Sequence, residues 1–287
     1  MNSWELVKDK NEGRVLVLGH RGSPLREREN TLKSFKRAIE EGADGVELDV
    51  HPTLDNHLVV SHDNSLKRVY GLDMKIEDSR FSDIRRDAPE VPLLSEVFDL
   101  LGPVYYDIEI KADKPLGFRK EVVDLLWEEL QRRKEFWPHI MISSFNPLAM
   151  RRAERLMKKT FPLGIIYEGE NIPKICRKGQ GRLLFDCSFL KPKWNIAERE
   201  KENKPNWTVC PWTVDTEEGI KAMLGEDVTC FVNSVRENYL IASTDKGYAA
   251  ILPNPFMIKR FPQNSNKERF IAKVVRVLQK NNYLIVS

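Results

Sequence analysis

The sequence predicts an α/β fold, most economically a closed (β/α)8 TIM barrel with a small insertion after the second strand and a C-terminal extension. Short apolar, β-branched segments alternate with helix-like segments, which indicates a parallel sheet. The chain of 287 residues has room for one such barrel. Eight strands are expected, at Arg14–His20, Gly45–Val50, Tyr105–Lys111, His139–Phe145, Phe161–Glu168, Arg182–Ser188, Trp207–Val214 and Thr229–Ser234. A doubly wound open sheet is the alternative, although no G-x-G-x-x-G pattern follows the first strand.

The expected helices carry ordinary boundary and periodicity signals. Asn30 is a good N-cap for the first helix, and Gly42 ends it. Between them, Leu32, Phe35 and Ile39 recur at helical spacing. Further helices are expected at Leu94–Leu101, Arg119–Lys134, Asn146–Lys159 and Thr216–Leu224.

One strand-like segment, His57–Asp63, interrupts the alternation of strands and helices. It follows the second strand too closely for a parallel crossover, which needs about a dozen residues. The two strands are therefore expected to form an antiparallel hairpin. A turn centred on Asp55–Asn56 would place His62 opposite Asp49.

The predicted organisation has three parts. A barrel domain spans residues 1–245, and an insertion with one clear helix occupies about residues 64–104. A C-terminal extension, residues 246–287, is expected to pack on or beside the barrel. It contains a helix-like stretch, Glu268–Lys280, and an apolar end, Tyr283–Val286, but no pattern that indicates its role.

Composition excludes several classes of protein. With 46 basic and 43 acidic residues the net charge is +3, too balanced for a dedicated nucleic-acid binder. No uncharged apolar run reaches the roughly 18 residues of a transmembrane helix, and Met1–Lys10 does not resemble an export signal. We therefore expect a cytoplasmic protein without an integral membrane segment. The sequence does not indicate its oligomeric state.

Histidines cluster in the first part of the chain, where four of the five lie between positions 20 and 62. His20 ends the first strand on the side of the core residues, and a single histidine there is most simply a half-buried structural residue. His51 and His57 flank the expected hairpin turn and are expected at the surface. His20 and His62 remain candidates for chemistry because of their acidic neighbours.

Carboxylates from two strands are expected to face the same space. Glu47 and Asp49 are two residues apart in one strand, and Asp107, Glu109 and Lys111 share one side of the next. Buried carboxylates need a cation, and this set suits Mg²⁺ or Ca²⁺, or Mn²⁺, better than zinc. A structural ion pair between Glu47 and Lys111 is the simpler alternative.

Basic side chains accompany the acids, since Arg21 follows His20 and Lys111 follows Glu109 by two residues. Cations and a metal at one mouth would neutralise a phosphate. Cleavage of a phosphodiester also needs a base for the attacking oxygen and an acid for the leaving alkoxide, which two histidines can supply. The pattern indicates metal-assisted phosphodiester cleavage.

Several motifs resemble the signature of the glycerophosphodiester phosphodiesterase family over about residues 14–245. They are LGHRG at 18–22, ENTLKSFKRAIEEGADGVELDV at 29–50, LVVSHD at 58–63 and IEIK at 108–111, with weaker matches SSF at 143–145 and WTV at 212–214. The resemblance implies a TIM-barrel hydrolase that uses a divalent cation to split a small-molecule glycerophosphodiester into glycerol 3-phosphate and an alcohol.

The resemblance also implies roles for individual residues. These are Glu47, Asp49 and Glu109 as metal ligands, His20 and His62 as the acid–base pair, and Arg21, Lys111, Asn30 and Trp212 as substrate-binding residues. In the implied mechanism the glycerol 2-hydroxyl, activated by His20, attacks phosphorus, and His62 protonates the leaving alcohol. Water then opens the cyclic phosphate. The alternative for Asn30 is a helix N-cap alone, and the alternative for Trp212 is a core aromatic.

The chain departs from the family pattern in three places. Arg28 stands where the family usually has Pro, Asp215 replaces an Asn after W-T-V, and Val232–Ser234 replaces I-T-D. These departures bear on substrate preference. Two further functions are therefore considered, a phospholipase D-like activity on lysophospholipids or sphingolipids and a catalytically silent phosphodiester-binding barrel.

Overall fold

The central element is a curled sheet of eight parallel strands. The computed structural model describes residues 17–112, 121–167, 177–193, 195–196, 208–213, 230–232, 240–244, 247–251 and 259–261. The strands are β1 (Val17–His20), β2 (Gly45–Pro52), β4 (Tyr105–Ile110), β5 (Ile140–Ser144), β6 (Leu163–Tyr167), β7 (Phe189–Pro192), β8 (Thr208–Val209) and β9 (Cys230–Val232). They pair in the order β8-β7-β6-β5-β4-β2-β1-β9. This order, which follows the chain from β1 to β8 and sets β9 beside β1, is that of a (β/α)8 barrel, so the predicted fold class is confirmed.

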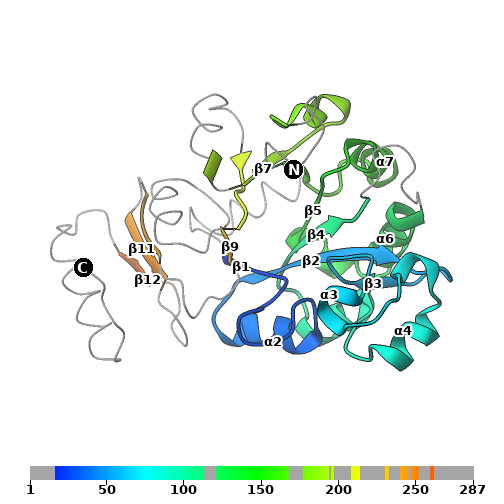
Figure 1. Cartoon of the computed structure of the whole chain (residues 1–287). Helices are drawn as coiled ribbons and strands as arrows, with labels where there is room; N and C mark the ends of the chain where they lie inside the picture. Colours follow the sequence, from blue (N-terminus) through cyan, green and yellow to red (C-terminus); the bar gives the residue numbers. More distant parts are fainter. Residues whose placement is uncertain are drawn as a thin grey trace.

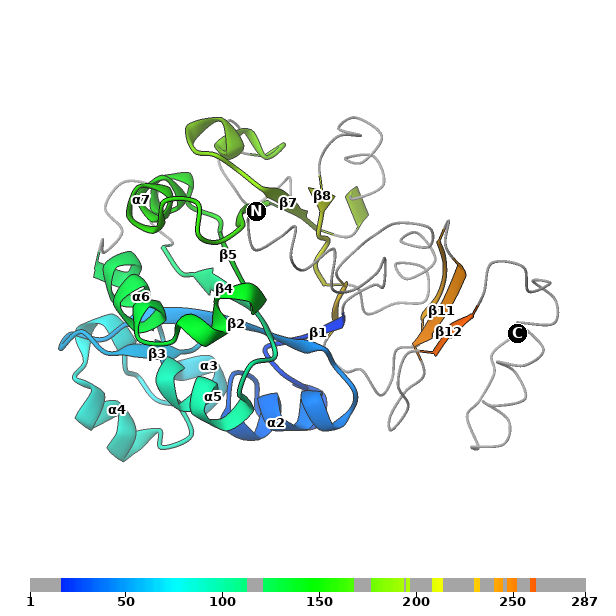
Figure 2. The same cartoon turned by 180° about the vertical axis from the view of Figure 1, so that it is seen from behind.

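Helices cover the outer side of this sheet (Figure 1, and from behind in Figure 2). They are α2 (Leu32–Glu40), α5 (Leu94–Leu101), α6 (Glu121–Gln131) and α7 (Pro147–Met157). Val46, Leu48 and Val50 of β2 are fully buried in the apolar layer beneath these helices. Because side chains alternate along a strand, the residues between them point to the other face of the sheet, inside the curl.

Two sequence expectations about these elements are wrong. The sixth strand is not Arg182–Ser188, where a 3-10 helix, η4 (Gln180–Leu184), occurs instead, but β7 further along the chain. Leu183 and Leu184 made that segment look like a strand, yet both are exposed. The N-cap of α2 is Thr31, which accepts a hydrogen bond from the amide of Ser34. The helix expected at Thr216–Leu224 lies outside the described residues.

The predicted antiparallel hairpin is present, with a register that differs by one residue. β3 (Leu58–Val60) pairs with β2 so that His51 faces Val59. Three residues rather than two separate the paired Thr53 and His57, and the last of them, Asn56, has the positive φ of 62° that such a loop requires. Ser61, not His62, therefore lies opposite Asp49 and donates its amide hydrogen to the Asp49 carbonyl.

The insertion has its own small core. It contains α3 (Lys67–Tyr70), η1 (Ile76–Asp78) and α4 (Phe81–Asp87) ahead of α5, of which the sequence predicted only α5. Leu66, Ile76 and Ile84 are buried there against Val59 of β3. This apolar contact fixes the insertion on the β2–β3 hairpin, next to the carboxyl end of β2.

A second sheet follows the barrel strands in the chain. It is antiparallel, in the order β10-β11-β12, and consists of β10 (Leu240–Thr244), β11 (Gly247–Ile251) and β12 (Lys259–Phe261). Its strands lie on both sides of the boundary predicted at residues 245 and 246, and that boundary stays a prediction. The helix and apolar end expected beyond it lie outside the described residues. Among the helices that are described, none has the length and apolar character to cross a membrane.

Candidate active site

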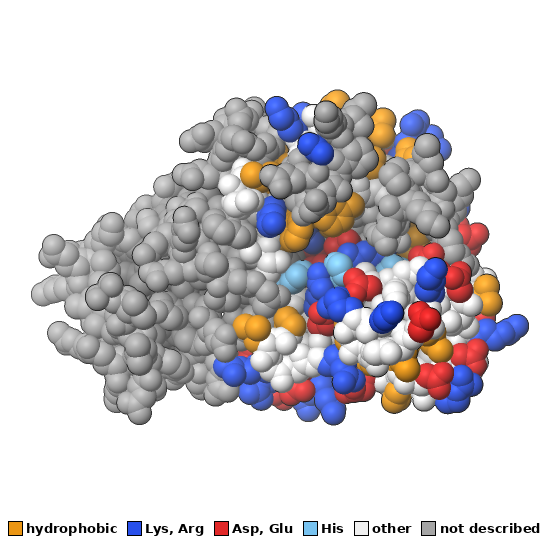
Figure 3. Space-filling view, viewed as in Figure 1, with side chains coloured by type: hydrophobic (Ala, Val, Ile, Leu, Met, Phe, Trp, Pro, Cys, Tyr) orange, Lys and Arg blue, Asp and Glu red, His pale blue; other side chains and the backbone are white. Residues whose placement is uncertain are grey.

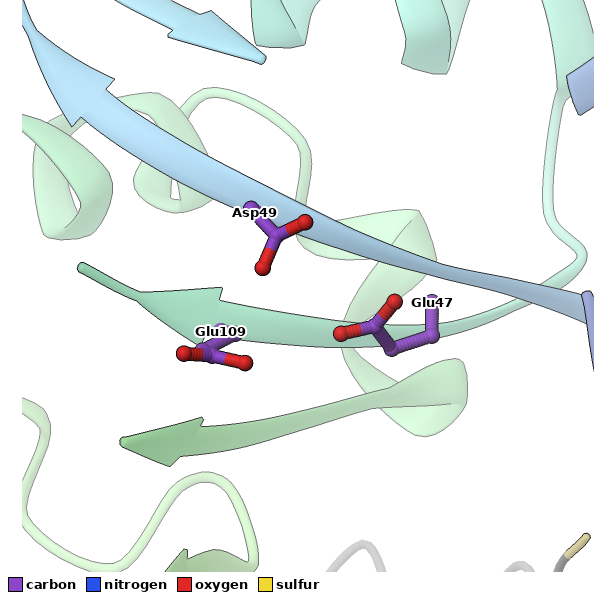
Figure 4. A group of neighbouring side chains, drawn as sticks. All are labelled: Glu47, Asp49 and Glu109. Carbon is purple, nitrogen blue, oxygen red and sulfur yellow. The ribbon is translucent and has the colours of Figure 1, made fainter. Parts of the chain in front are cut away.

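Carboxylates of β2 and β4 converge inside the curl of the sheet. Parallel pairing sets Glu47 beside Asp107 and Asp49 beside Glu109. The oxygens of Glu47, Asp49 and Glu109 come within 4.8 Å of one another, and Figure 4 shows all three pointing into one space. The residues are 1%, 0% and 6% exposed, respectively. In both strands, residues two positions apart thus share one face, as predicted.

Two buried lysines partly compensate these acids. Lys111 Nζ lies 3.0 Å from Asp49 Oδ1 and 2.7 Å from Glu109 Oε1. The predicted alternative, an ion pair between Glu47 and Lys111, is not the arrangement found, because Lys111 lies between the other two carboxylates. Near Glu47 the cation is Lys191 of β7, with Nζ 3.9 Å from Glu47 Oε1.

Lys191, Asp107 and Ser143 were not predicted as site residues. Lys191 Nζ lies 2.6 Å from Asp107 Oδ2 and donates to Ser143 Oγ, which in turn donates to Asp107 Oδ1. The sequence predicted that Asp107 faces the same side as Glu109. This fourth acid had no assigned cation, which was the available signal that a further buried cation is needed. Sequence reasoning missed Lys191 because the sixth strand had been placed too early in the chain.

The charges of this buried group do not balance. Four carboxylates, those of Glu47, Asp49, Asp107 and Glu109, face the ammonium groups of Lys111 and Lys191. The buried carboxylates outnumber the buried ammonium groups by two. Arg21 Nε, 3.8 Å from Asp49 Oδ2, offsets part of this excess, and a divalent cation can neutralise the rest. Asp49 Oδ1 and Glu109 Oε1 are close to Lys111 but receive no well-aligned hydrogen bond within the described part of the chain. Hard carboxylate oxygens of this kind fit a divalent cation.

The pKa directions follow from burial and charge. Burial, reinforced by the charge of Asp49, raises the pKa of Glu47 well above its usual value. Burial opposes ionisation of Asp49 too, but Lys111, His62 and Arg21 hold the pKa of Asp49 far below its usual range. The pKa of Asp49 is lowered and that of Glu47 is raised because the neighbouring cations compensate the charge of Asp49 more than that of Glu47.

The turn after β1 brings Arg21 and Asn30 to the carboxylates. Arg21 has a φ of 57°, and its amide donates to both the carbonyl and the carboxylate Oε2 of Glu47, at 3.0 and 3.2 Å. A Cβ on Gly22 would lie 2.4 Å from Ser34 Oγ, so the glycine of the LGHRG motif allows α2 to approach. Asn30 Nδ2 donates to Asp49 Oδ2 at 2.8 Å. The side chain of Asn30 is therefore directed into the site instead of capping α2.

His20 lies beside the carboxylates at the end of β1. Its Nε2 is 3.9 Å from Glu47 Oε2, and its Nδ1 is 3.4 Å from the hydroxyl of Thr213, a contact that the sequence did not predict. Trp212 precedes this threonine, packs edge-on against Phe145 and donates its indole hydrogen to the Lys191 carbonyl. Trp212 is thus next to the site, linked to His20 through Thr213.

His62 follows β3 and is about one-third exposed. Its Nδ1 lies 2.6 Å from Asp63 Oδ1, which leaves Nε2 as the nitrogen available for other contacts. His51, expected at the surface, is fully buried: Nδ1 is 3.3 Å from Glu77 and Nε2 is 3.2 Å from the His62 carbonyl. The expectation failed because the insertion covers this side of the hairpin. His57 is exposed, as predicted.

From outside, the site opens in a hollow of the described surface. Figure 3 shows imidazoles together with acidic and basic side chains at its floor. Apolar side chains line part of its rim (Figure 3). A hollow with imidazoles, cations and buried carboxylates can bind an anion and transfer protons to and from it.

Comparison with known proteins decides the family. The model of the glycerophosphoryl diester phosphodiesterase family matches residues 20–233. The chain belongs to this family. The assignment confirms the predicted resemblance and, with it, the enzyme class, a phosphoric diester hydrolase.

Individual relatives agree with the assignment. A glycerophosphodiester phosphodiesterase of Caldanaerobacter subterraneus is 30% identical over 250 residues, 78% of this chain and 99% of that protein. The crystal structure of a glycerophosphodiester phosphodiesterase from Thermotoga maritima has a TM-score of 0.64 and 29% identity, covering 77% of this chain and 95% of that chain. An Oleispira antarctica phosphodiesterase, solved with its product sn-glycerol-3-phosphate, shares the fold, with a TM-score of 0.64 at 22% identity, covering 81% and 96% of the two chains.

Proposed function

We propose that the protein hydrolyses glycerophosphodiesters to glycerol 3-phosphate and an alcohol. The family assignment supports the reaction, and the named product complex of the Oleispira antarctica relative illustrates it in that protein. The observation that carries the proposal is the group of three buried carboxylates with two imidazoles, His20 and His62, at its edge. This combination supports charge neutralisation and proton transfer at one mouth.

Glu47, Asp49 and Glu109 are the residues proposed to hold a divalent cation. The excess of buried carboxylates over buried lysines and the carboxylate oxygens without aligned donors support this role. When bound, the cation supplies Lewis-acid neutralisation of the phosphoryl oxygens. Mg²⁺, Ca²⁺ and Mn²⁺ are the proposed ions, because all three accept oxygen-only ligand sets.

The remaining polar groups are assigned to the phosphate and to the protons. Arg21 and Lys111 are proposed to contact the phosphate, since both are cations beside the carboxylates. His20 is proposed to take the proton of the attacking glycerol 2-hydroxyl, and His62 to give a proton to the departing alkoxide. Hydrolysis of the cyclic phosphate then restores both protonation states. Trp212, with Phe145, is proposed to line the alcohol side.

The experiment is a metal and substrate panel. Release of glycerol 3-phosphate from glycerophosphocholine and glycerophosphoethanolamine is measured with Mg²⁺, Mn²⁺ or Ca²⁺ and with EDTA. Turnover is expected with a metal and not with EDTA, and His20→Ala is expected to abolish it. His57→Ala is the matched control, because His57 is exposed and stacks on Phe81 away from the carboxylates. Absence of product with every metal would contradict the proposal.

Two other functions are outcomes of the same panel. A mouse lysophospholipase D is 32% identical over 120 residues, only 36% of this chain and 38% of that protein. Faster turnover of a lysophospholipid than of its deacylated counterpart would favour that activity. Binding of glycerol 3-phosphate without turnover of either substrate would indicate a silent phosphodiester-binding barrel. The cytoplasmic location stays a prediction.

A further inference from the structure

A single side chain of the insertion, Arg68 of α3, contacts both sides of the site. Its Nε donates to Asp63 Oδ2 at 2.5 Å, and its two terminal nitrogens donate to the carboxylate oxygens of Glu29 at 2.8 and 2.6 Å. Glu29 belongs to the loop after β1, whereas Asp63 follows β3. The guanidinium therefore bridges two segments that are far apart in the sequence.

The first bridge leads to His62. Asp63 uses Oδ2 for Arg68 and its other oxygen, Oδ1, for His62 Nδ1. Burial opposes ionisation of Asp63, but the hydrogen bonds from Arg68 and His62 lower its pKa. An ionised carboxylate at Nδ1 keeps the hydrogen on that nitrogen and fixes the plane of the ring. Nε2 then faces away from Asp63.

The second bridge leads to Arg21. Arg68 and Glu29 form a bidentate pair, and Glu29 Oε1 also accepts a hydrogen bond from Arg21 at 3.1 Å. Arg21 Nε is in turn 3.8 Å from Asp49 Oδ2. A bidentate pair is directional as well as charged, so it restricts where the Glu29 carboxylate, and hence Arg21, can lie.

The insertion holds α3 in place for these contacts. Leu66, just before α3, is buried in the core of the insertion, and its amide donates to the Met74 carbonyl. Tyr70, at the end of α3, lies under the guanidinium of Arg28, which also pairs with Glu90. Arg28 is one of the departures from the family pattern. Besides Arg68, Arg28 thus joins the β1 loop to the insertion at two further points, Tyr70 and Glu90.

We infer that Arg68 is a positioning residue that sets His62 and Arg21 at a fixed separation through Asp63 and Glu29. The inference rests on the proposed function, in which His62 transfers a proton and Arg21 contacts the phosphate. Arg68 itself is half exposed and acts through the two carboxylates. Its loss should leave every proposed acid, base and metal ligand present but less well ordered relative to one another.

The first test compares Arg68→Met with Arg86→Met. Arg86 lies on α4 of the same insertion and also pairs with two carboxylates, but both belong to α4, so it is the matched control. With glycerophosphocholine and the most effective metal, Arg68→Met should lower kcat/KM about 10- to 100-fold, and Arg86→Met less than about 2-fold. Equal kcat/KM values for the two variants would overturn the inference.

The conservative variant separates positioning from charge. Arg68→Lys keeps the cation, but a lysine cannot form the same fork to Glu29 together with the contact to Asp63. We expect its kcat/KM to lie between those of wild type and Arg68→Met. A kcat/KM equal to that of wild type would show that charge alone is needed, which contradicts a positioning role.

The two bridges have different kinetic signatures. Asp63→Asn should mainly lower kcat, because it disturbs a proton-transferring group, whereas Glu29→Gln should mainly raise KM, because it disturbs a phosphate contact. Arg68→Met should show both effects. If Asp63→Asn and Glu29→Gln change kcat and KM in the same proportion, the assignment of Asp63 to proton transfer and of Glu29 to phosphate binding is wrong.

Amide hydrogen exchange gives a readout that needs no substrate. Loss of Arg68 should speed exchange in residues 21–30 and 61–66, and Arg86→Met should not. Unchanged exchange in both segments would overturn the bridge regardless of activity. If the wild-type protein turns over no glycerophosphodiester but Arg68→Met still exchanges faster than wild type in both segments, the proposed function is contradicted and the bridging role of Arg68 is supported. The two failures are therefore distinguishable.

Discussion

Asp49 lies directly opposite Glu109 in the parallel pairing of β2 with β4, and both carboxylates contact the ammonium of Lys111. One lysine thus holds together two of the three acids assigned to the metal. Burial opposes the charge of Lys111, yet Asp49 and Glu109 raise its pKa above the usual value. Lys111 therefore stays charged over the working range of pH, and its ammonium lies near the oxygens offered to a metal.

This relationship predicts the behaviour of Lys111→Met. Without metal the variant leaves the buried carboxylates of Asp49 and Glu109 without their nearest cation, which costs about 3–5 kcal/mol and lowers Tm by roughly 5–10 °C. Added Mg²⁺ or Mn²⁺ should restore more stability than it adds to wild type. Thermal melts with EDTA and with metal check this, with Lys33→Met, an exposed lysine, as control. Equal metal-dependent Tm increases in variant and wild type would contradict the prediction.

Lys191 and Asp107 are predicted to be a coupled pair. Lys191→Met leaves the Asp107 carboxylate buried without its nearest cation and should destabilise the protein by about 3–5 kcal/mol. The double variant Lys191→Met/Asp107→Asn removes both charges and should be less destabilised than the sum of the single variants. Urea unfolding of the four proteins measures the coupling, and additive changes in unfolding free energy would rule the pair out.

The contacts of Asp55 in the hairpin turn predict that the stability of the protein depends on pH. Burial opposes ionisation of Asp55, but donation from Thr53 Oγ1 and the Phe81 amide lowers the pKa of Asp55 to about 2. Because the folded pKa lies below the unfolded value of about 3.9, the stabilisation is complete above that value and is lost as pH falls through 2.

Asp55→Asn removes this contribution. Its unfolding free energy should be lower than that of wild type by about 1 kcal/mol at pH 7 and pH 5, and the difference should be roughly halved at pH 3. Urea denaturation at the three pH values measures it. Asp73→Asn, at an exposed position, should show no such trend. A difference that grows as the pH falls would have the wrong sign.

The parts of the site that follow local rules were predictable from the sequence. Alternation along a strand set Glu47 and Asp49 on one face, and the matching alternation around Glu109 needed only parallel pairing to bring them together. The succession of strands predicted the barrel in the same way. These rules involve only neighbours in the chain and the geometry of one sheet.

The parts that depend on tertiary contacts were not predictable. Lys191 breaks the apolar pattern of a buried strand, because its partner is Asp107 three strands away in the sheet. His51 is buried because the insertion supplies Glu77 against it. The hairpin register depended on one extra loop residue, and a one-residue change moves a side chain to the opposite face.

The central claim is that Glu47, Asp49 and Glu109 together hold one divalent cation. Calorimetric titration of the EDTA-treated protein with Mn²⁺ tests it most directly, using wild type, Glu109→Gln and the surface control Glu40→Gln. We predict one Mn²⁺ per chain for wild type and Glu40→Gln, and an affinity at least about 10-fold weaker for Glu109→Gln. Wild-type affinity in Glu109→Gln, or no Mn²⁺ binding to the wild-type chain, would contradict the account.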